Sequence, residues 1–315
     1  MSHRPHVGAS VDLGSNSVHL LVAELDGHEL RPLVDESVFL GLGATIDEQA
    51  HLGTARRADL VEALLRYATT ARELGASTIT FMGTEPIRRA GDAARIVADV
   101  ERATGVPLHV LSHEEEAYLT LVGVTMGLQV VHETLVVDIG GGSSEFCAVA
   151  SGGLARAAGL RLGSNRLTSR YVRDDPPTAD QLASMATAAD EILQAALPSA
   201  PTDLVAVGGT ASNLLKVTAA GTADRILTPA RLAEAVATLT ARPAAETSER
   251  FVVNPTRARL LPAGAVIVEA LMRRYGVDEV RASEEGIREG AILVTQHAGL
   301  AWRDRLPELA HGWRR

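Results

Sequence analysis

Apolar and polar positions along the first third of the chain follow two different periods. A strand-like apolar run ends at Asp12, a short polar turn follows, and a second apolar run covers residues 19–24. Residues 60–74 then carry apolar side chains at three- and four-residue steps, which predicts an amphipathic helix. A strand over 78–82, a helix over 92–104 and a strand over 106–111 are expected next. Strands first, then alternating helix and strand, are typical of a mixed sheet covered by helices.

The second half of the chain repeats this order less regularly. A hairpin is followed by a predicted helix over 179–197 and a predicted strand over 203–207. Two more helices are expected, one over 212–219 and one that begins with Thr228 as N-cap and Pro229 in its first turn. The pattern therefore predicts two α/β halves of similar plan.

A strand-turn-strand segment occurs once in each half. Both copies begin with an apolar strand that ends in Asp-x-Gly, make a tight polar turn and continue into another apolar strand. Such internal similarity predicts that the two halves share a fold. The two copies, 126 residues apart, are Val11-Asp12-Leu13-Gly14-Ser15-Asn16-Ser17-Val18 and Val137-Asp138-Ile139-Gly140-Gly141-Gly142-Ser143-Ser144.

The residues of both turns suit a phosphate ligand. Glycine lets backbone N–H groups approach a ligand closely, serine hydroxyls donate hydrogen bonds, and aspartate carboxylates can hold a hydrated Mg2+ ion. A single glycine-serine hairpin is more often only a turn, but two matched copies opening matched halves favour phosphate binding. The hydroxyl and carboxylate residues concerned are Asp12, Ser15, Ser17, Asp138, Ser143 and Ser144.

A third candidate phosphate loop follows the strand over 203–207. Gly208 and Gly209 precede Thr210, which is expected to be the N-cap of the helix over 212–219. A helix N-terminus attracts anions because its first N–H groups have no partner within the helix. The alternative is a merely structural strand-to-helix turn. Its position after the second hairpin favours the phosphate loop.

Composition limits the class of protein. With 315 residues, of which 46% are apolar and 22% charged, the chain is long enough for two ordinary cores. A net charge of −9 and an aromatic content of 3% provide neither the basic stripe nor the stacking surface of a nucleic-acid binder. No apolar stretch is long enough for a membrane helix, and residues 1–6 include no apolar signal segment. We therefore expect no membrane association and a cytoplasmic location.

The cysteine and histidines suggest no further chemistry. Cys147 is the single cysteine, so it cannot form an internal disulfide, which fits a reducing compartment. Its strand-like surroundings predict a small core residue rather than a nucleophile. The ten histidines lack the spacing of zinc ligands. Because the net charge is −9, any polyanionic substrate must be held locally, by backbone amides and a bound divalent cation.

Several segments together resemble the exopolyphosphatase and guanosine pentaphosphate phosphatase (Ppx/GppA) family. The resemblance implies an α/β fold, namely a two-domain actin-like ATPase (ribonuclease H-like) fold with mixed sheets flanked by helices and an interdomain cleft. We expect an N-terminal domain over 1–127 and a C-terminal domain over 128–315, with a last helix able to pack back on the first domain. The segments, in order over about residues 8 to 293, are Asp12-Leu-Gly-Ser-Asn-Ser17, Glu114-Glu-Glu-Ala117, Asp138-Ile-Gly-Gly-Gly-Ser-Ser-Glu145, Leu162-Gly-Ser-Asn-Arg-Leu167 and Arg288-Glu-Gly290.

The resemblance also implies catalytic roles. Glu116 matches the family glutamate that activates the attacking water, just ahead of an Ala-x-Leu step. The alternative is that Glu114 to Glu116 merely form an acidic first helical turn. Asp138 and Glu145 would orient the metal or the water, and Asp12, a further metal ligand, would face them across the cleft.

Phosphate contacts are implied at the turns and at two arginines. Arg88 matches a family arginine expected to hold phosphate bidentately, and Arg166 is a weaker second candidate. The substrate-binding residues are then Asp12, Gly14, Ser15, Asn16, Ser17, Arg88, Gly140, Gly141, Gly142, Ser143, Ser144, Arg166, Gly208, Gly209 and Thr210.

The implied reaction is hydrolysis of the terminal phosphoanhydride of inorganic polyphosphate, with Mg2+ or Mn2+ offsetting charge on the chain and the leaving group. Short chains are expected as substrates, because the extra helical domains of longer members are missing. Three alternatives stay open: a guanosine pentaphosphate 5'-phosphohydrolase, a non-catalytic sensor of polyphosphate or of guanosine penta- or tetraphosphate, and a kinase or ATPase of the wider superfamily. A homodimer is expected because relatives often pair.

Several positions depart from the family pattern. A family Thr-Ser-Ala loop is replaced by Thr84-Glu85-Pro86, arginines are commonly found where Phe39 and Tyr118 stand, and Arg259 replaces an aspartate. These changes alter groups near a site that must hold a polyanion, which favours the sensor. The retained carboxylates favour an enzyme, because a pure binder gains nothing from carboxylates that face phosphate.

Overall fold

The computed structural model describes residues 6–26, 29–150, 153 and 155–314. The chain divides into two compact units: unit 1 comprises residues 1–129 and 285–315, and unit 2 comprises residues 130–284. The first division lies close to the boundary expected after residue 127, and the C-terminal segment belongs to unit 1. Within the described ranges, no helix is both long and apolar enough to cross a membrane.

Unit 1 is built on a mixed sheet with five strands among its described residues. The first strand pairs antiparallel with the second and parallel with the fourth, which confirms the predicted mixed sheet. The strands are β1 (His6–Leu13), β2 (Ser17–Asp26), β3 (Glu29–Phe39), β4 (Thr78–Gly83) and β5 (Leu108–Val110), in the order β3-β2-β1-β4-β5.

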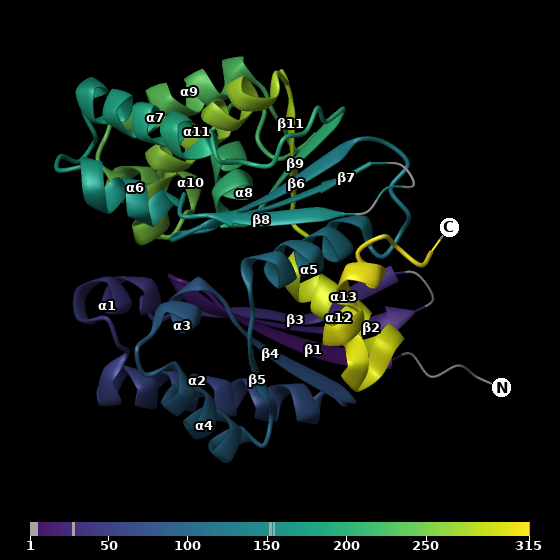
Figure 1. Ribbon diagram of the computed structural model, residues 1–315. Helices are drawn as coiled ribbons and strands as arrows, with labels where there is room; N and C mark the ends of the chain where they lie inside the picture. Colours follow the sequence, from purple (N-terminus) through teal and green to yellow (C-terminus); the bar gives the residue numbers. More distant parts are fainter. Residues whose placement is uncertain (1–5, 27–28, 151–152, 154, 315) are drawn as a thin grey trace. The chain divides into compact units, whose positions relative to one another are not determined.

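Helices cover both faces of this sheet. They are α1 (Leu42–Gln49), α2 (Gly53–Glu73), α3 (Glu85–Arg89), α4 (Ala93–Thr104), α5 (His113–Thr125), α12 (Ile287–Ala298) and α13 (Trp302–Leu309), with a 3-10 turn, η1 (Gly299–Ala301), before the last. Figure 1 shows α2 and α4 on one face of the sheet and α5, α12 and α13 on the other. The helix predicted from residues 60–74 is thus part of the longer α2.

Strand β2 shows why both faces are covered. Val18 and Leu20 belong to the core shared with α2 and α4, while Leu21 and Ala23 pack against Ile292 of α12. Successive side chains of a strand point to opposite faces of a sheet. A nearly continuous apolar run therefore forms a strand that is buried on both sides.

Unit 2 contains a second mixed sheet, with six strands among the described residues. Its strands are β6 (Thr134–Ile139), β7 (Ser144–Val149), β8 (Arg156–Leu160), β9 (Asp203–Val207), β10 (Ile226–Leu227) and β11 (Val280–Ser283), in the order β10-β11-β9-β6-β7-β8. Strand β6 pairs antiparallel with β7 and parallel with β9. The run β8-β7-β6-β9 thus repeats the run β3-β2-β1-β4 of unit 1, as the internal similarity predicts.

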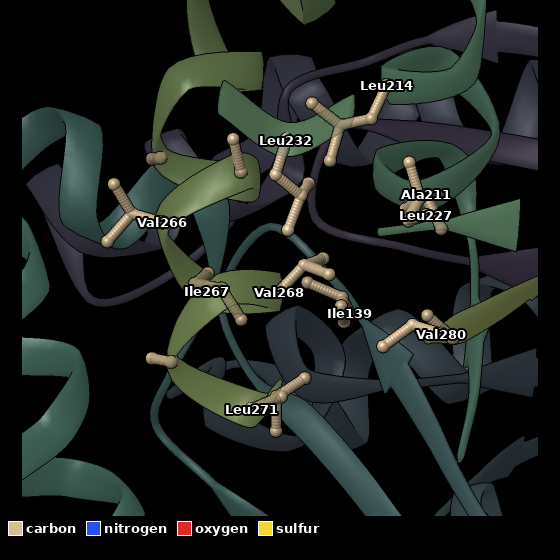
Figure 2. Packing of buried hydrophobic residues seen from close by; sticks show 14 of the residues in the cluster. Ile139, Ala211, Leu214, Leu227, Leu232, Val266, Ile267, Val268, Leu271 and Val280 are labelled. Carbon is tan, nitrogen blue, oxygen red and sulfur yellow. The ribbon is translucent and has the colours of Figure 1, made fainter. Parts of the chain in front are cut away.

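The helices of unit 2 are α6 (Ser164–Tyr171), α7 (Ala179–Leu193), α8 (Gly209–Lys216), α9 (Pro229–Thr240), α10 (Ala244–Phe251) and α11 (Pro255–Tyr275). Helix α7 is shorter than the prediction over 179–197, because Pro198 disfavours helix in the residues before it. Helix α11 is central: it contacts the other five. Ile139 of β6 lies in the same core as Leu214 of α8 and Leu271 of α11 (Figure 2).

Two helices of unit 1 touch through glycines. A Cβ atom on Gly123 of α5 would lie 1.9 Å from the carbonyl oxygen of Gly286, and one on Gly290 of α12 would lie 1.9 Å from that of Leu119. The backbones of α5 and α12 therefore approach more closely than any side chain would permit. This packing holds the C-terminal segment of the chain against α5.

Candidate active site

The two predicted phosphate turns have the same backbone geometry. In each, the N–H of the first glycine donates to the carbonyl of the serine three residues later. The distance is 3.1 Å from Gly14 to Ser17 and 3.0 Å from Gly140 to Ser143. The similarity seen in the sequence is therefore also a similarity of turn structure, once in each unit.

The residues opposite the two aspartates give the hairpins different charges. Asp12 is the register partner of His19, whereas Asp138 is the register partner of Glu145. Residues directly opposite in an antiparallel pair have Cβ atoms about 4.5 to 5.5 Å apart on the same face of the sheet. Glu145 is only 4% exposed, so water hydrates its carboxylate poorly, whereas Asp138 is partly exposed. Like charges so placed favour a bound cation, and carboxylate oxygens are ligands that Mg2+ and Mn2+ accept.

Gly208 lies beside Asp138 at the end of β9. Its φ of +94° favours glycine, and a Cβ there would lie 3.0 Å from Oδ1 of Asp138. Helix α8 begins at Gly209 with Gly208 as N-cap, so the prediction that Thr210 is the N-cap is wrong. The left-handed glycine turns the chain directly after the strand, and the helix starts earlier than expected. Thr210 lies inside the first turn, where its Oγ1 donates to the Ile139 carbonyl at 3.2 Å.

Two arginines lie against these backbone segments of unit 2. Arg166 donates from Nε to the Gly142 carbonyl at 2.8 Å. A Cβ on Gly209 would lie 1.5 Å from Nη1 of Arg257, so the Arg257 guanidinium lies directly on the N-terminus of α8. No motif in the sequence singled out Arg257. Arg257 puts a positive charge in the first turn of α11, where it opposes the helix dipole. A charge in such an unfavourable position is a sequence signal that the side chain has a partner outside its own helix.

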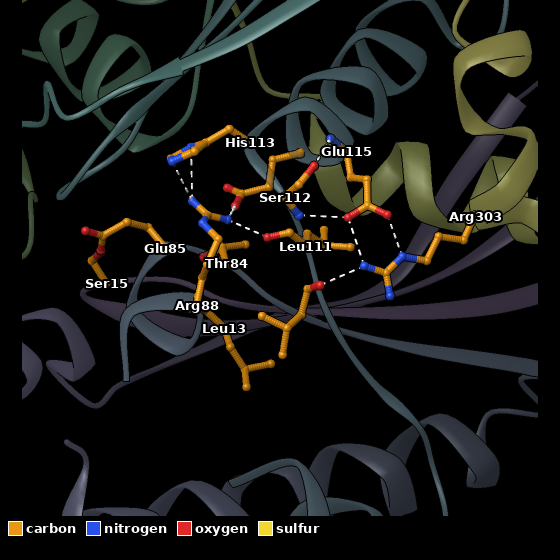
Figure 3. Close-up of polar contacts among 12 residues, drawn as sticks. Leu13, Ser15, Thr84, Glu85, Arg88, Leu111, Ser112, His113, Glu115 and Arg303 are labelled. Carbon is orange, nitrogen blue, oxygen red and sulfur yellow. Dashed lines mark hydrogen bonds and ion pairs between the residues drawn. The ribbon is translucent and has the colours of Figure 1, made fainter. Parts of the chain in front are cut away.

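The first turn of unit 1 is held by the segment that follows β4. Thr84 Oγ1 donates to the Leu13 carbonyl at 2.9 Å, which is the counterpart of the Thr210 contact in unit 2. Ser15 Oγ donates to Oε2 of Glu85 at 3.3 Å (Figure 3). The hydroxyl predicted to bind phosphate is thus hydrogen-bonded to a carboxylate.

Helix α5 carries Glu116, and its N-terminus is fixed by a hydrogen-bond network (Figure 3). In a capping box, Glu115 N–H donates to Ser112 Oγ at 3.2 Å and Ser112 N–H donates to Glu115 Oε2 at 2.7 Å. Arg303 of α13 donates to both Glu115 oxygens, at 2.5 and 2.9 Å, and to the Val110 carbonyl at 2.8 Å. Burial alone would raise the pKa of Glu115, but the hydrogen bonds from Arg303 and Ser112 outweigh it and lower that pKa.

Arg88 contacts the predicted catalytic base. Its Nη1 pairs with Glu116 and donates to the Leu111 carbonyl at 2.5 Å, and its Nη2 lies 3.0 Å from Nδ1 of His113. The Glu116 side chain is 8% exposed, and the ion pair compensates for its lost hydration. Glu116 also belongs to the acidic first turn of α5, so the two interpretations of this segment are compatible. The structure brings the predicted phosphate-binding arginine and the predicted base together within unit 1.

Three of the positions that depart from the family pattern differ from one another in their surroundings. Phe39, at the end of β3, is half exposed. Tyr118 packs against the core formed by α5, α12 and α13. Arg259 pairs with Asp175 at 3.5 Å within unit 2. Tyr118 therefore contributes to packing and Arg259 to an ion pair.

Cys147 is a core residue, as predicted. Its side chain is fully buried in β7 and forms no disulfide. Burial raises the pKa of the thiol to about 12, so almost no thiolate is present near neutral pH. The thiol is not a nucleophile in this structure.

Comparisons with known proteins cover most of the chain. Residues 21–298 match the model of the Ppx/GppA phosphatase family. The chain is 31% identical over 298 residues to exopolyphosphatase 1 of Mycobacterium leprae, covering 90% of this chain and 87% of that protein. It is 27% identical over 290 residues to a guanosine-5'-triphosphate,3'-diphosphate pyrophosphatase of Vibrio cholerae, covering 90% of this chain but only 58% of that protein.

Solved structures give the same picture. A Ppx/GppA family member from Aquifex aeolicus is 26% identical with a TM-score of 0.81, covering 94% of this chain and 99% of that one. An exopolyphosphatase from Cytophaga hutchinsonii shares the fold with a TM-score of 0.83 at 20% identity, with coverage of 94% and 99%. The similarity to solved structures therefore extends over both units.

Proposed function

Because this chain belongs to the Ppx/GppA phosphatase family, we propose that it hydrolyses the terminal phosphoanhydride bond of inorganic polyphosphate and releases orthophosphate. The observation that carries the proposal is the pair of aspartate hairpins with matching turn geometry, one in each unit. The similarity to an exopolyphosphatase over 87% of its length supports the same activity.

The carboxylates of unit 2 suit a divalent cation. Asp138 and Glu145 would hold it, because they are opposite each other on one face of the β6–β7 hairpin, and Asp12 is a further candidate ligand. Mg2+ or Mn2+, when bound, would offset negative charge on the phosphate chain and the leaving group. Gly208 leaves room beside the Asp138 carboxylate.

Backbone groups of the turns would hold the substrate phosphates. A phosphate can accept hydrogen bonds from N–H groups at a glycine-rich turn and at a helix N-terminus. Arg166 and Arg257 lie against such segments in unit 2 and would add positive charge. The backbone groups concerned are those of Gly14, Ser15, Asn16, Gly141, Gly142 and Gly209.

Glu116 would take a proton from the attacking water. Its carboxylate is held by Arg88, whose second nitrogen, Nη2, contacts the His113 ring. An incoming phosphate would replace the His113 contact, because charge-assisted hydrogen bonds between a guanidinium and a phosphate are strong and can be bidentate. Arg88 would then hold the base and the substrate at once.

The test is orthophosphate release from short polyphosphate in Mg2+, with and without a chelator. We expect release by the wild type, and loss of at least about a hundredfold in Glu116→Gln, as general bases contribute about 10² to 10⁴ in rate. Glu114→Gln is the matched control, since Glu114 is exposed in the same turn and should keep full activity. Tight polyphosphate binding without any release would instead identify a sensor.

Guanosine pentaphosphate is the second candidate substrate. The similarity to the Vibrio cholerae pyrophosphatase favours it, although the match covers only part of that protein. Parallel assays with both substrates decide between them, because the activity with the larger kcat/KM identifies the preferred substrate.

We further propose that the protein acts in the cytoplasm as a homodimer. The buried cysteine without a disulfide is compatible with a reducing compartment. Sedimentation equilibrium would measure the oligomeric state, and a monomer at all concentrations would contradict the dimer.

A further inference from the structure

Glu85 places a carboxylate in the predicted phosphate-binding turn of unit 1. It is the first residue of α3, directly after the Thr84 contact that holds the turn. Its side chain is 5% exposed, and Oε2 accepts the hydrogen bond from Ser15. A hydroxyl that donates to Glu85 cannot donate to a phosphate at the same time. In the second turn, the residue that corresponds to Ser15 is Gly141, which has no side chain that could form such a contact.

Near the first turn, two carboxylates share the guanidinium of Arg89. Arg89 pairs with Glu85 at 2.8 Å and with Asp47 at 2.6 Å. One guanidinium thus serves two carboxylates, and the three side chains together carry a formal charge of −1. Burial alone would lower the pKa of Arg89, but the hydrogen bonds that it donates to Asp47 and Glu85 outweigh this effect and raise that pKa. Arg89 is therefore engaged by the carboxylates rather than available to an anion.

We propose that Glu85 is a specificity-determining residue, which weakens the binding of long, highly charged phosphate chains at the first turn and so favours short ones. The proposal rests on the phosphatase function proposed above. A buried charge is screened less by water and salt than an exposed one, so its repulsion of an anion at the neighbouring turn is strong. Each added phosphate unit within a Debye length of Glu85, about 8 to 10 Å at physiological ionic strength, brings further negative charge. The repulsion therefore grows over the first few units of the chain and then levels off.

The experiment compares KM and kcat for tripolyphosphate and for a long-chain polyphosphate. Glu85→Gln keeps the shape of the side chain and removes its charge. We expect KM for the long chain to fall about tenfold, which corresponds to about 1.4 kcal/mol, with a smaller fall for tripolyphosphate and little change in kcat. Asp47→Asn should shift KM in the same direction but less, because Asp47 is 41% exposed.

The matched control is Asp99→Asn. Asp99 is also paired with arginines in unit 1, Arg57 at 2.7 Å and Arg102 at 2.8 Å, but it lies on α4 rather than at the turn. Its KM values should equal those of the wild type. Equal KM values for Glu85→Gln and the wild type, or the same shift in Asp99→Asn, would overturn the proposal. If Glu85→Gln does not fold, unchanged KM values in Asp47→Asn overturn it.

Calorimetric titration with tripolyphosphate and the long-chain polyphosphate separates this proposal from the proposed function. If neither the wild type nor any variant releases orthophosphate, the proposed phosphatase function is wrong. Tighter binding by Glu85→Gln, with a larger gain for the long chain, would still establish the role of Glu85. Unchanged binding would refute it.

Discussion

Replacing Arg303 by alanine tests whether α13 positions the helix that carries Glu116, the proposed general base. Arg303 donates three hydrogen bonds, two to Glu115 and one to the Val110 carbonyl. Glu115 in turn caps the helix that carries Glu116. The variant should therefore affect both the stability of unit 1 and the rate of the reaction, although Arg303 is not proposed to touch the substrate.

The expected loss of stability follows from these contacts. A hydrogen bond to a charged group contributes about 1.5 to 3 kcal/mol, but the Arg303 side chain is 39% exposed, and solvent screens the pair. We therefore expect a total loss of about 2 kcal/mol rather than the sum of the bonds. A shift of Glu116 by about 1 Å can reduce kcat by up to about a hundredfold.

Urea unfolding measures the loss of stability, and steady-state kinetics measure the fall in kcat. The pH dependence of the stability loss then tests whether it comes from the pair of Arg303 and Glu115. The folded-state pKa of Glu115 is lowered, so its contribution is present above its unfolded pKa of about 4.3 and is lost as the pH falls through the folded pKa. The stability difference between wild type and Arg303→Ala should thus be full at pH 7 and shrink in acid.

The control is Arg305→Ala on the same helix. Arg305 pairs with Glu308 one turn away, and the two side chains are 41% and 69% exposed, so little change is expected in stability or kcat. Equal effects of the two substitutions, or a stability loss in Arg303→Ala that persists unchanged in acid, would refute the positioning role.

Two further predictions concern packing and the thiol. Gly290→Ala should destabilise unit 1 by about 3 kcal/mol, because its Cβ would lie 1.9 Å from the Leu119 carbonyl oxygen. Gly75→Ala is the control: a Cβ there would meet open space, but φ is +81°, so the substitution should cost only about 1 kcal/mol. Equal decreases in Tm for the two variants would contradict this account. Cys147, whose pKa is raised to about 12 by burial, should not react with a disulfide reagent at pH 8 until the protein unfolds, and fast labelling of the folded protein would refute its burial.

The hairpins and the mixed sheets could be predicted because their signals are local. The apolar strands and the glycine turns around Asp12 and Asp138 lie within short stretches of the chain. Glycines that permit a tight turn and strands with apolar runs need no distant partner to be identified. The repeat then relates the two sheets, because similar segments adopt similar folds.

The contacts of the candidate site could not be predicted in the same way. Arg88 and Glu116 are 28 residues apart and lie on different helices, so no periodicity relates them.

Two helices of unit 2 were also hard to predict. Helix α11 is apolar on most faces and contains Pro262, which hides the helical period and suggests a break. Thr210 has the residue type of an N-cap, but the positive φ of Gly208 starts the helix earlier.

The discontinuity of unit 1 has a consequence for synthesis on the ribosome. Its first segment emerges before unit 2, but α12 and α13, which complete its core with Leu293, Trp302 and Leu306, emerge after unit 2. At about 5 to 20 residues per second, roughly 10 to 30 seconds separate the two segments. Unit 2 is contiguous and can fold first. Unit 1 is therefore completed only after unit 2 has been made, and until then its sheet lacks the α12 residue Ile292 that covers Leu21 and Ala23.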